Sequence, residues 1–294
     1  MRPIYSFLFA SIFMLSCSKE EVEIPDFEVH VSSANLAVGE NVTFNFTGNP
    51  DNITFYSGEQ GSEYDNRNRT DITNGRPTLD FTTRVQSGSQ SNSLRLMVSS
   101  DFSGVYDTTN IRTANWTDIT DKVALSTGAD NTPSGNLDLN EFIVKDKPLY
   151  FAYRYIAQPL ATQRNWLVRI FNINNTLADG RVINVAAIGT GGWLAVDFLN
   201  TNIKWTISST QLAINGNNTA VPVAGSEDWV ITKPLYINRI APDPGVPVKN
   251  MSNRVESYGY AFSKVGTYKV TFVATNENVY GRREVVKQLS IIVK

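Results

Sequence analysis

Few side chains in this sequence are suited to covalent or metal chemistry. It contains one cysteine, Cys17, and one histidine, His30, which alternates with Val29 and Val31. Most metal sites and nucleophile–histidine pairs need more such groups, so the sequence predicts neither. No G-x-S-x-G, H-E-x-x-H or phosphate-loop motif is present, and the glycine-rich run 189–192 lacks the lysine of a phosphate loop. We expect His30 to be exposed or at an edge.

Carboxylates alone could still hydrolyse a glycosidic bond, because that reaction needs two of them about 5–10 Å apart. The 28 acidic residues contain no pair that their spacing singles out, and with 26 basic residues they leave a net charge of −2. Nucleic-acid binding normally needs an excess of positive charge. We therefore predict a protein that is not an enzyme, with an unrecognised glycosidase as an alternative, and no nucleic-acid partner.

Aromatic side chains point to ligand binding instead, because exposed rings stack on the apolar faces of sugars. Trp193 follows the glycine-rich run and shares a strand face with Asp197, opposite Leu194, Val196 and Phe198. We predict that Trp193 and Asp197 lie on an exposed ligand-binding face. The alternative is that Trp193 packs in a second layer.

Some of the other aromatic residues are further candidates for ligand binding, and some are expected in the hydrophobic core. Tyr56, beside the alternating Ile53 and Phe55, and Tyr64, in a polar loop, are further candidate ligand-binding residues. Large aromatic side chains that follow an apolar strand pattern are usually buried. On this basis we expect three more to lie in the core: Trp116, Trp205 and Trp229.

The elements that would position these side chains are strands. Apolar residues alternate with polar ones within four runs: 42–46, 94–98, 149–155 and 268–274. Such a period of two, with Gly, Asn, Asp and Ser turns between the runs, is typical of β-sandwiches. Helical periodicity is nearly absent, and only 140–144 could form a single turn. We predict an all-β fold.

The first residues resemble a bacterial lipoprotein signal. The apolar run 4–15 has the length of a signal peptide and is too short to span a bilayer. It ends at Met14-Leu15-Ser16-Cys17, which resembles a lipobox and implies that a signal peptide, 1–16, is removed before an acylated Cys17. An ordinary secretory signal is the alternative. No other apolar stretch is long enough to span a membrane, so we expect attachment through the lipid anchor only.

The tether 17–26 carries a second signal, Ser18-Lys19-Glu20-Glu21. It resembles the export signal of Bacteroidetes lipoproteins, which implies the extracellular face of the outer membrane. Asp107-Thr108-Thr109 resembles the O-glycosylation acceptor of the same phylum, with Thr108 as the modified residue.

Residues 27–68 and 250–294 resemble the two halves of one Ig-like domain of the polycystic-kidney-disease (PKD) type. The first half is carried by 37–44 and 53–59, and the second by 258–262, 266–274 and 288–293. The resemblance implies a PKD/Ig-like β-sandwich interrupted by a large insertion. Two separate incomplete sandwiches are the alternative.

The insertion, 69–249, resembles a galactose-binding-like jelly roll, through 99–104, 114–119 and 134–139. Such jelly rolls often hold a structural Ca²⁺, which makes Asp101 and Asp138 candidate ligands; plain turn residues are the alternative. No other cofactor is expected. Three prolines between 242 and 247 are typical of an extended crossover back to the first domain.

The whole mature chain resembles an uncharacterised family of Bacteroidetes surface lipoproteins, a domain of unknown function found with starch-utilisation-type glycan-uptake systems. The resemblance implies a cell-surface, outer-membrane lipoprotein that binds a polysaccharide or oligosaccharide without cleaving it and passes it to a transporter complex. The alternative function is an adhesion or scaffold lipoprotein with a protein partner.

Overall fold

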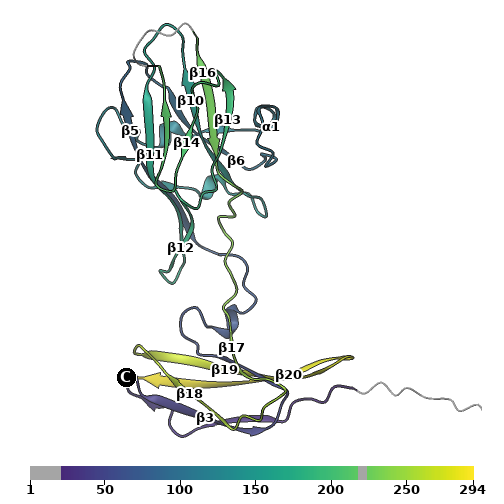
Figure 1. Ribbon diagram of the computed structural model, residues 1–294. Coiled ribbons are helices and arrows are strands. Elements are labelled where there is room, and N and C mark those ends of the chain that lie inside the picture. The colour runs from purple at the N-terminus through teal and green to yellow at the C-terminus, as the bar shows by residue number, and fades with distance from the viewer. Residues whose placement is uncertain (1–20, 218–223) are drawn as a thin grey trace, which may run out of the picture. The chain divides into compact units, whose positions relative to one another are not determined.

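The fold is all-β, as the alternating pattern predicts. The structure is a computed structural model that describes residues 21–217 and 224–294, with 47% strand and 6% helix (Figure 1). The chain divides into two compact units. One comprises the described residues up to Arg69 together with Pro242–Lys294, and the other is Thr70–Ala241.

The first unit is a sandwich of two sheets. Its strands are β1 (Phe27–Val31), β2 (Asn35–Leu36), β3 (Asn41–Gly48), β4 (Asn52–Tyr56), β17 (Val246–Lys249), β18 (Ser257–Ala261), β19 (Gly266–Asn278) and β20 (Gly281–Val293), with one 3₁₀ turn, Tyr64–Asn66. One sheet has the order β1-β3-β18 and the other β17-β4-β19-β20-β2. Rings of Phe44, Phe55 and Phe272 meet between them, with centroids 5.0 to 5.9 Å apart. The alternation in β3 therefore reports a buried face correctly.

One glycine of this unit is required by a close approach of the backbone. Gly48 ends β3 opposite Phe27 and has φ of +88°. A Cβ atom at this position would lie 1.8 Å from the carbonyl oxygen of Asp26. Only glycine combines that conformation with that contact.

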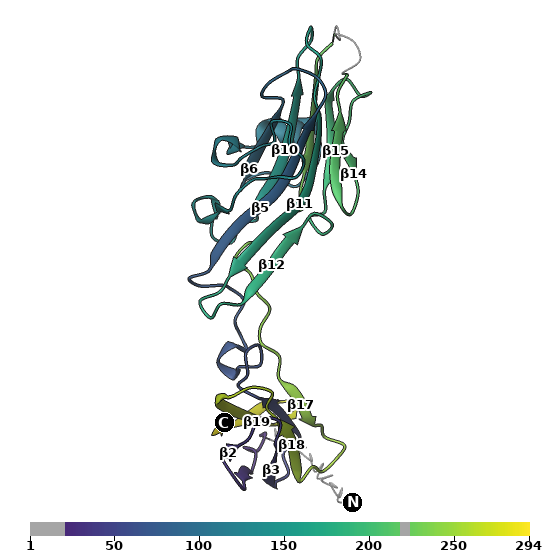
Figure 2. The same cartoon turned by 90° about the vertical axis from the view of Figure 1, so that its left-hand side faces the viewer.

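The second unit is a larger sandwich. Its strands are β5 (Arg76–Gln86), β6 (Leu94–Ser99), β7 (Thr117–Asp118), β8 (Thr132–Pro133), β9 (Leu137–Asp138), β10 (Tyr150–Ala157), β11 (Asn165–Thr176), β12 (Val182–Ala187), β13 (Leu194–Leu199), β14 (Thr206–Ile207), β15 (Gln211–Asn215) and β16 (Ser226–Ile231). One sheet has the order β13-β16-β10-β6-β7. The other has the order β14-β15-β11-β5-β8, with β12 and β9 as additional partners of β11 and β5. Figure 2 shows β11 between β5 and β15.

The sheet that contains β10 is apolar on both faces. Phe151, Tyr153 and Tyr155 are fully buried in the core between the sheets. On the opposite face, Tyr150 and Ala152 are buried in a second cluster, which also contains Phe102, Ile111 and Trp229. Residues 99–118 contribute to this outer layer and include the only α-helix in the described part of the chain, α1 (Thr108–Thr113).

The helix α1 was missed by the sequence analysis. Its signal is the N-cap, because the carboxylate of Asp107 accepts a hydrogen bond from the Asn110 backbone N–H at 2.7 Å. With six residues, α1 is too short for a helical apolar period to stand out. The expected turn within 140–144 is present as a 3₁₀ turn, Asn140–Phe142, and further 3₁₀ residues lie at Thr120–Lys122.

The domain boundaries differ from those predicted. The first unit ends at Arg69 and resumes at Pro242, whereas the sequence predicted a change at 68/69 and a return at 250. The second boundary is displaced because β17 pairs with β4, through Val246 with Phe55 and Pro247 with Thr54. Residues 246–249 are therefore an edge strand of the first unit, a position that tolerates proline.

Candidate functional site

The prediction that Trp193 is an exposed stacking platform is wrong. Its side chain is 7% exposed, and its indole N–H donates to the carbonyl of Ile188 at 3.0 Å. The ring packs edge-on against Phe171, at 4.9 Å between centroids, and lies 5.9 Å from Tyr153. Trp193 is thus part of the core between the two sheets.

The error has a physical cause in β13. Apolar side chains pack on both of its faces, since Trp193, just before the strand, lies in the inter-sheet core while Val196 lies in the outer cluster with Phe198 packed against it. Alternation identifies two faces but does not say which one meets the second sheet. Leu194, expected on the buried face, is 46% exposed.

Asp197 is half-buried, and it lies beside a second carboxyl group that is buried. Asp197 is in register with Asp228 of β16, which is fully buried. Burial is the main cause that raises the pKa of Asp228 to about 7, and the neighbouring Asp197 raises it further. The Ser226 hydroxyl donates to one Asp228 oxygen at 2.6 Å, and no described residue donates to the other. With Asp228 fully buried and Asp197 half-buried, this pair is not the exposed ligand-binding face that was predicted.

Tyr56 and Tyr64, the other two predicted binding residues, are brought together in the first unit. Their rings form a T-shaped pair with centroids 5.4 Å apart, and the Arg67 guanidinium lies 3.8 Å from the Tyr64 ring centre. Both line a cavity of about 430 Å³, which we call the tyrosine pocket. Arg282 and Glu284 of β20 complete its polar wall. Burial raises the pKa of Tyr56, so this phenol stays protonated at neutral pH.

The remaining predicted residues take structural positions. Thr108 is half-buried at the start of α1. Asp101 accepts hydrogen bonds from Ser99 and Asn115, which hold its pKa below the usual value although burial acts in the opposite direction. Asp138 accepts from the Asn140 backbone N–H at 2.8 Å. Calcium binding and glycosylation stay predictions.

The structure agrees better with the expected exposure of His30 and of the other tryptophans. His30 is exposed, Trp205 and Trp229 are buried, and Trp116 is half-buried. Residues 17–20 of the lipidation and export signals lie outside the described residues, and Glu21 is exposed.

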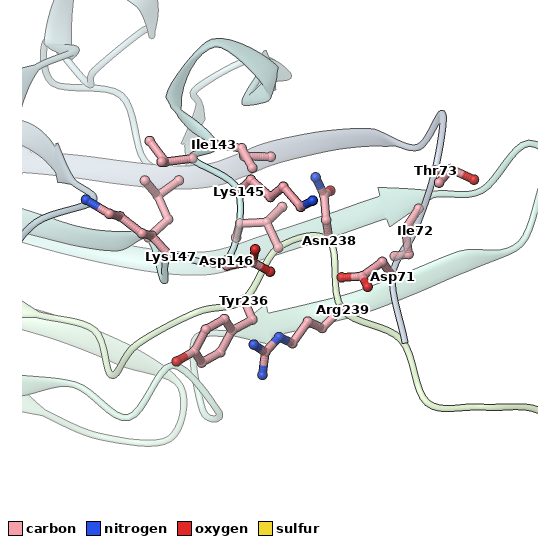
Figure 3. A pocket seen from close by; sticks show the side chains of 13 residues that line it. Asp71, Ile72, Thr73, Ile143, Lys145, Asp146, Lys147, Tyr236, Asn238 and Arg239 are labelled. Atoms are coloured by element: carbon pink, nitrogen blue, oxygen red, sulfur yellow. The ribbon is translucent and has the colours of Figure 1, made fainter. Parts of the chain in front are cut away.

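A further cavity lies in the second unit, and we call it the cleft. It has a volume of about 450 Å³ and is formed by three segments that are distant in sequence: 71–73, 143–149 and 236–239. Figure 3 shows side chains from all three gathered around one opening. None of its residues was predicted as a site.

Main-chain pairing holds the first and third segments together. Asp71 and Arg239 form an antiparallel bridge, and the Ile72 N–H donates to the Asn238 carbonyl at 2.7 Å. The second segment turns at Asp146, which has φ of +62°, and the Lys147 N–H donates to the Val144 carbonyl at 3.1 Å. Aspartate tolerates this left-handed conformation better than most residues.

The cleft combines an apolar base with polar walls. Ile72, Leu149 and Ile237 are buried beneath it, at 7%, 2% and 3% exposure. The Tyr236 ring is 39% exposed, and the guanidinium carbon of Arg239 lies 4.1 Å from its centre. Such a cation–π contact orients the ring.

Hydrogen-bonding groups of every kind line the same opening. The carboxylates of Asp71 and Asp146, the ammonium of Lys145 and the amide of Asn238 surround it (Figure 3). The Asn238 side-chain oxygen accepts from the buried Asn175 amide at 3.0 Å, which fixes the orientation of the Asn238 amide. Donors and acceptors are thus arranged beside an aromatic ring.

A sequence signal for the cleft exists. In Leu235-Tyr236-Ile237-Asn238-Arg239, Leu235 and Ile237 are buried while Tyr236 and Arg239 are exposed. The alternation therefore places a tyrosine on the solvent side. The contributions of Asp71 and Asp146 have no such signal, because only the fold brings these segments together.

Neither a membrane-spanning helix nor a metal-binding cluster is found among the described residues. Within residues 21–217 and 224–294, no helix is both long and apolar enough to cross a bilayer. The same residues contain no group of three or more His, Cys, Asp or Glu side chains placed to hold a metal ion.

The fold and the cleft define a two-unit β-sandwich protein with a polar, aromatic-walled cavity. A family model described as "Domain of unknown function (DUF5017)" matches residues 16–193, and the chain belongs to this family. Comparison with curated proteins and with solved structures gives no match.

Proposed function

We propose that this protein is a lipoprotein, anchored through Cys17 to the outer face of an outer membrane, which binds glycan in the cleft without cleaving it. The observation that carries the binding proposal is the exposed Tyr236 ring beside carboxylate, amide and cationic groups in one cavity of about 450 Å³. Sugars offer both an apolar face and many hydroxyl groups, so they fit such a lining. On this proposal the protein serves as an accessory to a polysaccharide import complex.

The binding mechanism follows from the lining. The free face of the Tyr236 ring stacks on a sugar face, while Arg239 holds the ring in place from 4.1 Å. Asp71 and Asp146 accept hydrogen bonds from sugar hydroxyls, and Lys145 and Asn238 donate to them. Three cationic side chains line the cleft against two carboxylates, which favours a neutral glycan over a strongly charged one. Stacking and hydrogen bonding require no cofactor.

Replacing Tyr236 with alanine should weaken glycan binding by about fivefold or more, because a lost stacking contact is worth roughly 1 kcal/mol or more. Affinity electrophoresis of residues 22–294 through gels that contain plant, fungal or host polysaccharides measures the effect as lost retardation. Tyr280→Ala is the matched control, since Tyr280 is 48% exposed and lines neither cavity.

Other outcomes of this experiment redirect the proposal. Loss of retardation in Tyr64→Ala, with Tyr236→Ala unchanged, would move the glycan site to the tyrosine pocket. Retardation by no polysaccharide would favour the alternative of a protein partner, and release of reducing ends would make the protein a glycosidase.

Replacing Cys17 with serine should abolish acylation and release the protein from the membrane fraction, because stable anchoring depends on the acyl chains. Replacing Lys19, Glu20 and Glu21 with alanine should keep the protein in the outer membrane but protect it from protease added to intact cells. Fractionation, protease accessibility and the mass of the N-terminal peptide measure these effects. A Cys17→Ser protein that stays in the membrane fraction would contradict the lipid anchor.

A further inference from the structure

The hairpin formed by β19 and β20 extends beyond the sheet to which it belongs. The two strands pair along their whole length, from Gly266 with Val293 to Asn278 with Gly281. The neighbouring strand β4 pairs with β19 only as far as Thr275. β2 pairs with β20 only at its other end. Figure 1 shows the hairpin projecting past the other strands of the first unit.

The tip of this hairpin is apolar and exposed. We define the hairpin tip as residues 278–281, in which Val279 is 91% exposed and Tyr280 is 48% exposed. Tight turns favour Gly, Asn, Asp, Pro and Ser, each for a conformational reason that valine and tyrosine do not share. Neither side chain belongs to a core cluster of the described residues. Turn chemistry and packing therefore leave the composition of the hairpin tip unexplained.

The chain segment that leads to the lipid anchor lies against the same hairpin. A Cβ atom on Gly281 would lie 4.0 Å from a methyl carbon of Val22. The Asn276 side-chain amide donates to the Glu23 carbonyl at 3.2 Å. Cys17 precedes Val22 by five residues, and five residues span at most about 18 Å. Acyl chains on Cys17 therefore enter the bilayer within about 18 Å of Val22, beside the hairpin tip.

We propose that the hairpin tip is a second membrane contact, which rests on the lipid surface beside the acylated Cys17. Val279 enters the apolar boundary, and Tyr280 lies at the headgroup level, where an amphipathic ring is favoured. This inference rests on the lipid anchor of the proposed function. Two membrane contacts at separate points restrict the rotation of the first unit relative to the membrane. The acyl chains alone would not restrict this rotation.

The charges near the hairpin tip indicate a contact by apolar burial rather than by attraction to anionic lipids. Arg282 pairs with Glu284 at 3.7 Å. Arg283 is exposed, but so are Glu277 and Glu23. Three acidic and two basic side chains therefore surround the hairpin tip, so attraction to anionic lipids does not drive its membrane contact.

A fluorescent label tests the proposal in the acylated, full-length mature protein. Because acylation consumes the Cys17 thiol, Val279→Cys supplies a single reactive thiol for an environment-sensitive dye. Val265→Cys is the matched control, since Val265 is 69% exposed and precedes the opposite end of β19, about 40 Å away. Both proteins are placed in phosphatidylcholine vesicles, with and without phosphatidylglycerol and nitroxide-labelled lipids.

We expect a blue-shifted emission and severalfold quenching by lipid nitroxides at position 279, equal in both lipid mixtures, and neither effect at position 265. A dye at 279 that stays as water-exposed as the dye at 265, on a protein whose Cys17 is acylated, would overturn the membrane contact alone. A Cys17 without acyl chains by mass would overturn the anchor and this proposal together. A blue shift without lipid quenching, increasing with protein density, would indicate a second copy of the chain and also overturn it.

Discussion

Replacing Trp193 with alanine is expected to lower the free energy of unfolding of the second unit by about 3–5 kcal/mol, the range for a large aromatic side chain removed from a core. The indole packs between Phe171 and Tyr153, and its N–H is satisfied by the Ile188 carbonyl at 3.0 Å. Gly191 makes room for the ring, because a Cβ atom there would lie 2.7 Å from the indole nitrogen. Truncation therefore leaves a cavity and removes a partner from a carbonyl.

Urea unfolding followed by tryptophan fluorescence measures this effect in one unit alone. All five tryptophans of the chain fall within Thr70–Ala241, so their fluorescence does not report on the first unit. Leu194→Ala is the control, because Leu194 is adjacent in sequence but 46% exposed, and it should change stability by about 0.5 kcal/mol or less. Full stability in Trp193→Ala together with lost glycan binding would instead favour an exposed stacking role for Trp193.

Replacing Asp228 with asparagine is expected to remove a pH dependence from the stability of the same unit. The pKa of Asp228 is raised to about 7 in the folded protein, chiefly by burial. Below pH 4 the carboxyl is protonated in both states, and its neutral form contributes its full stability. Between pH 4 and 7 the unfolded chain loses this proton while the folded protein keeps it. Stability therefore falls as pH rises through this window, on the order of 3–4 kcal/mol in total.

The comparison of wild type with Asp228→Asn between pH 4 and 8 isolates this contribution, because all other titrating groups are common to both proteins. The difference in the free energy of unfolding should change steadily from pH 4 to about 7 and then level off. Asp197→Asn should shift the upper end of the window to lower pH without abolishing it, since Asp197 raises the pKa of Asp228 less than burial does. Parallel profiles for wild type and Asp228→Asn would show that Asp228 titrates normally.

The two predictions concern residues that sequence patterns could not place. The alternation in β13 marks Trp193 and Asp197 as sharing a face, and they do share one. Their pattern does not reveal that this face meets the second sheet, because the outer layer also packs on the other face, where the Arg112 guanidinium lies 5.1 Å from the centre of the Phe198 ring. The pairing of Asp197 with Asp228 is set by strand order, which brings β13 beside β16 across some thirty residues of chain.

Local features of the fold could be predicted from the residues alone. A strand such as β3 follows from a period of two that any extended chain with one buried face must show. Membership in a family of unknown function agrees with the resemblance read from the residues. Tyr56 and Tyr64 were each singled out from the sequence, whereas their contact as a pair is seen only in the structure.

The cleft, in contrast, could not be predicted before the fold was known. Its walls come from 71–73, 143–149 and 236–239, and no local pattern relates segments so far apart. Main-chain bridges join these segments, Asp71 with Arg239 and Leu149 with Leu235. The physical reason is that side-chain periodicity records which residues are buried, whereas a binding cavity depends on which buried segments become neighbours. That choice is made by packing over the whole sandwich and not by the residues of any one strand.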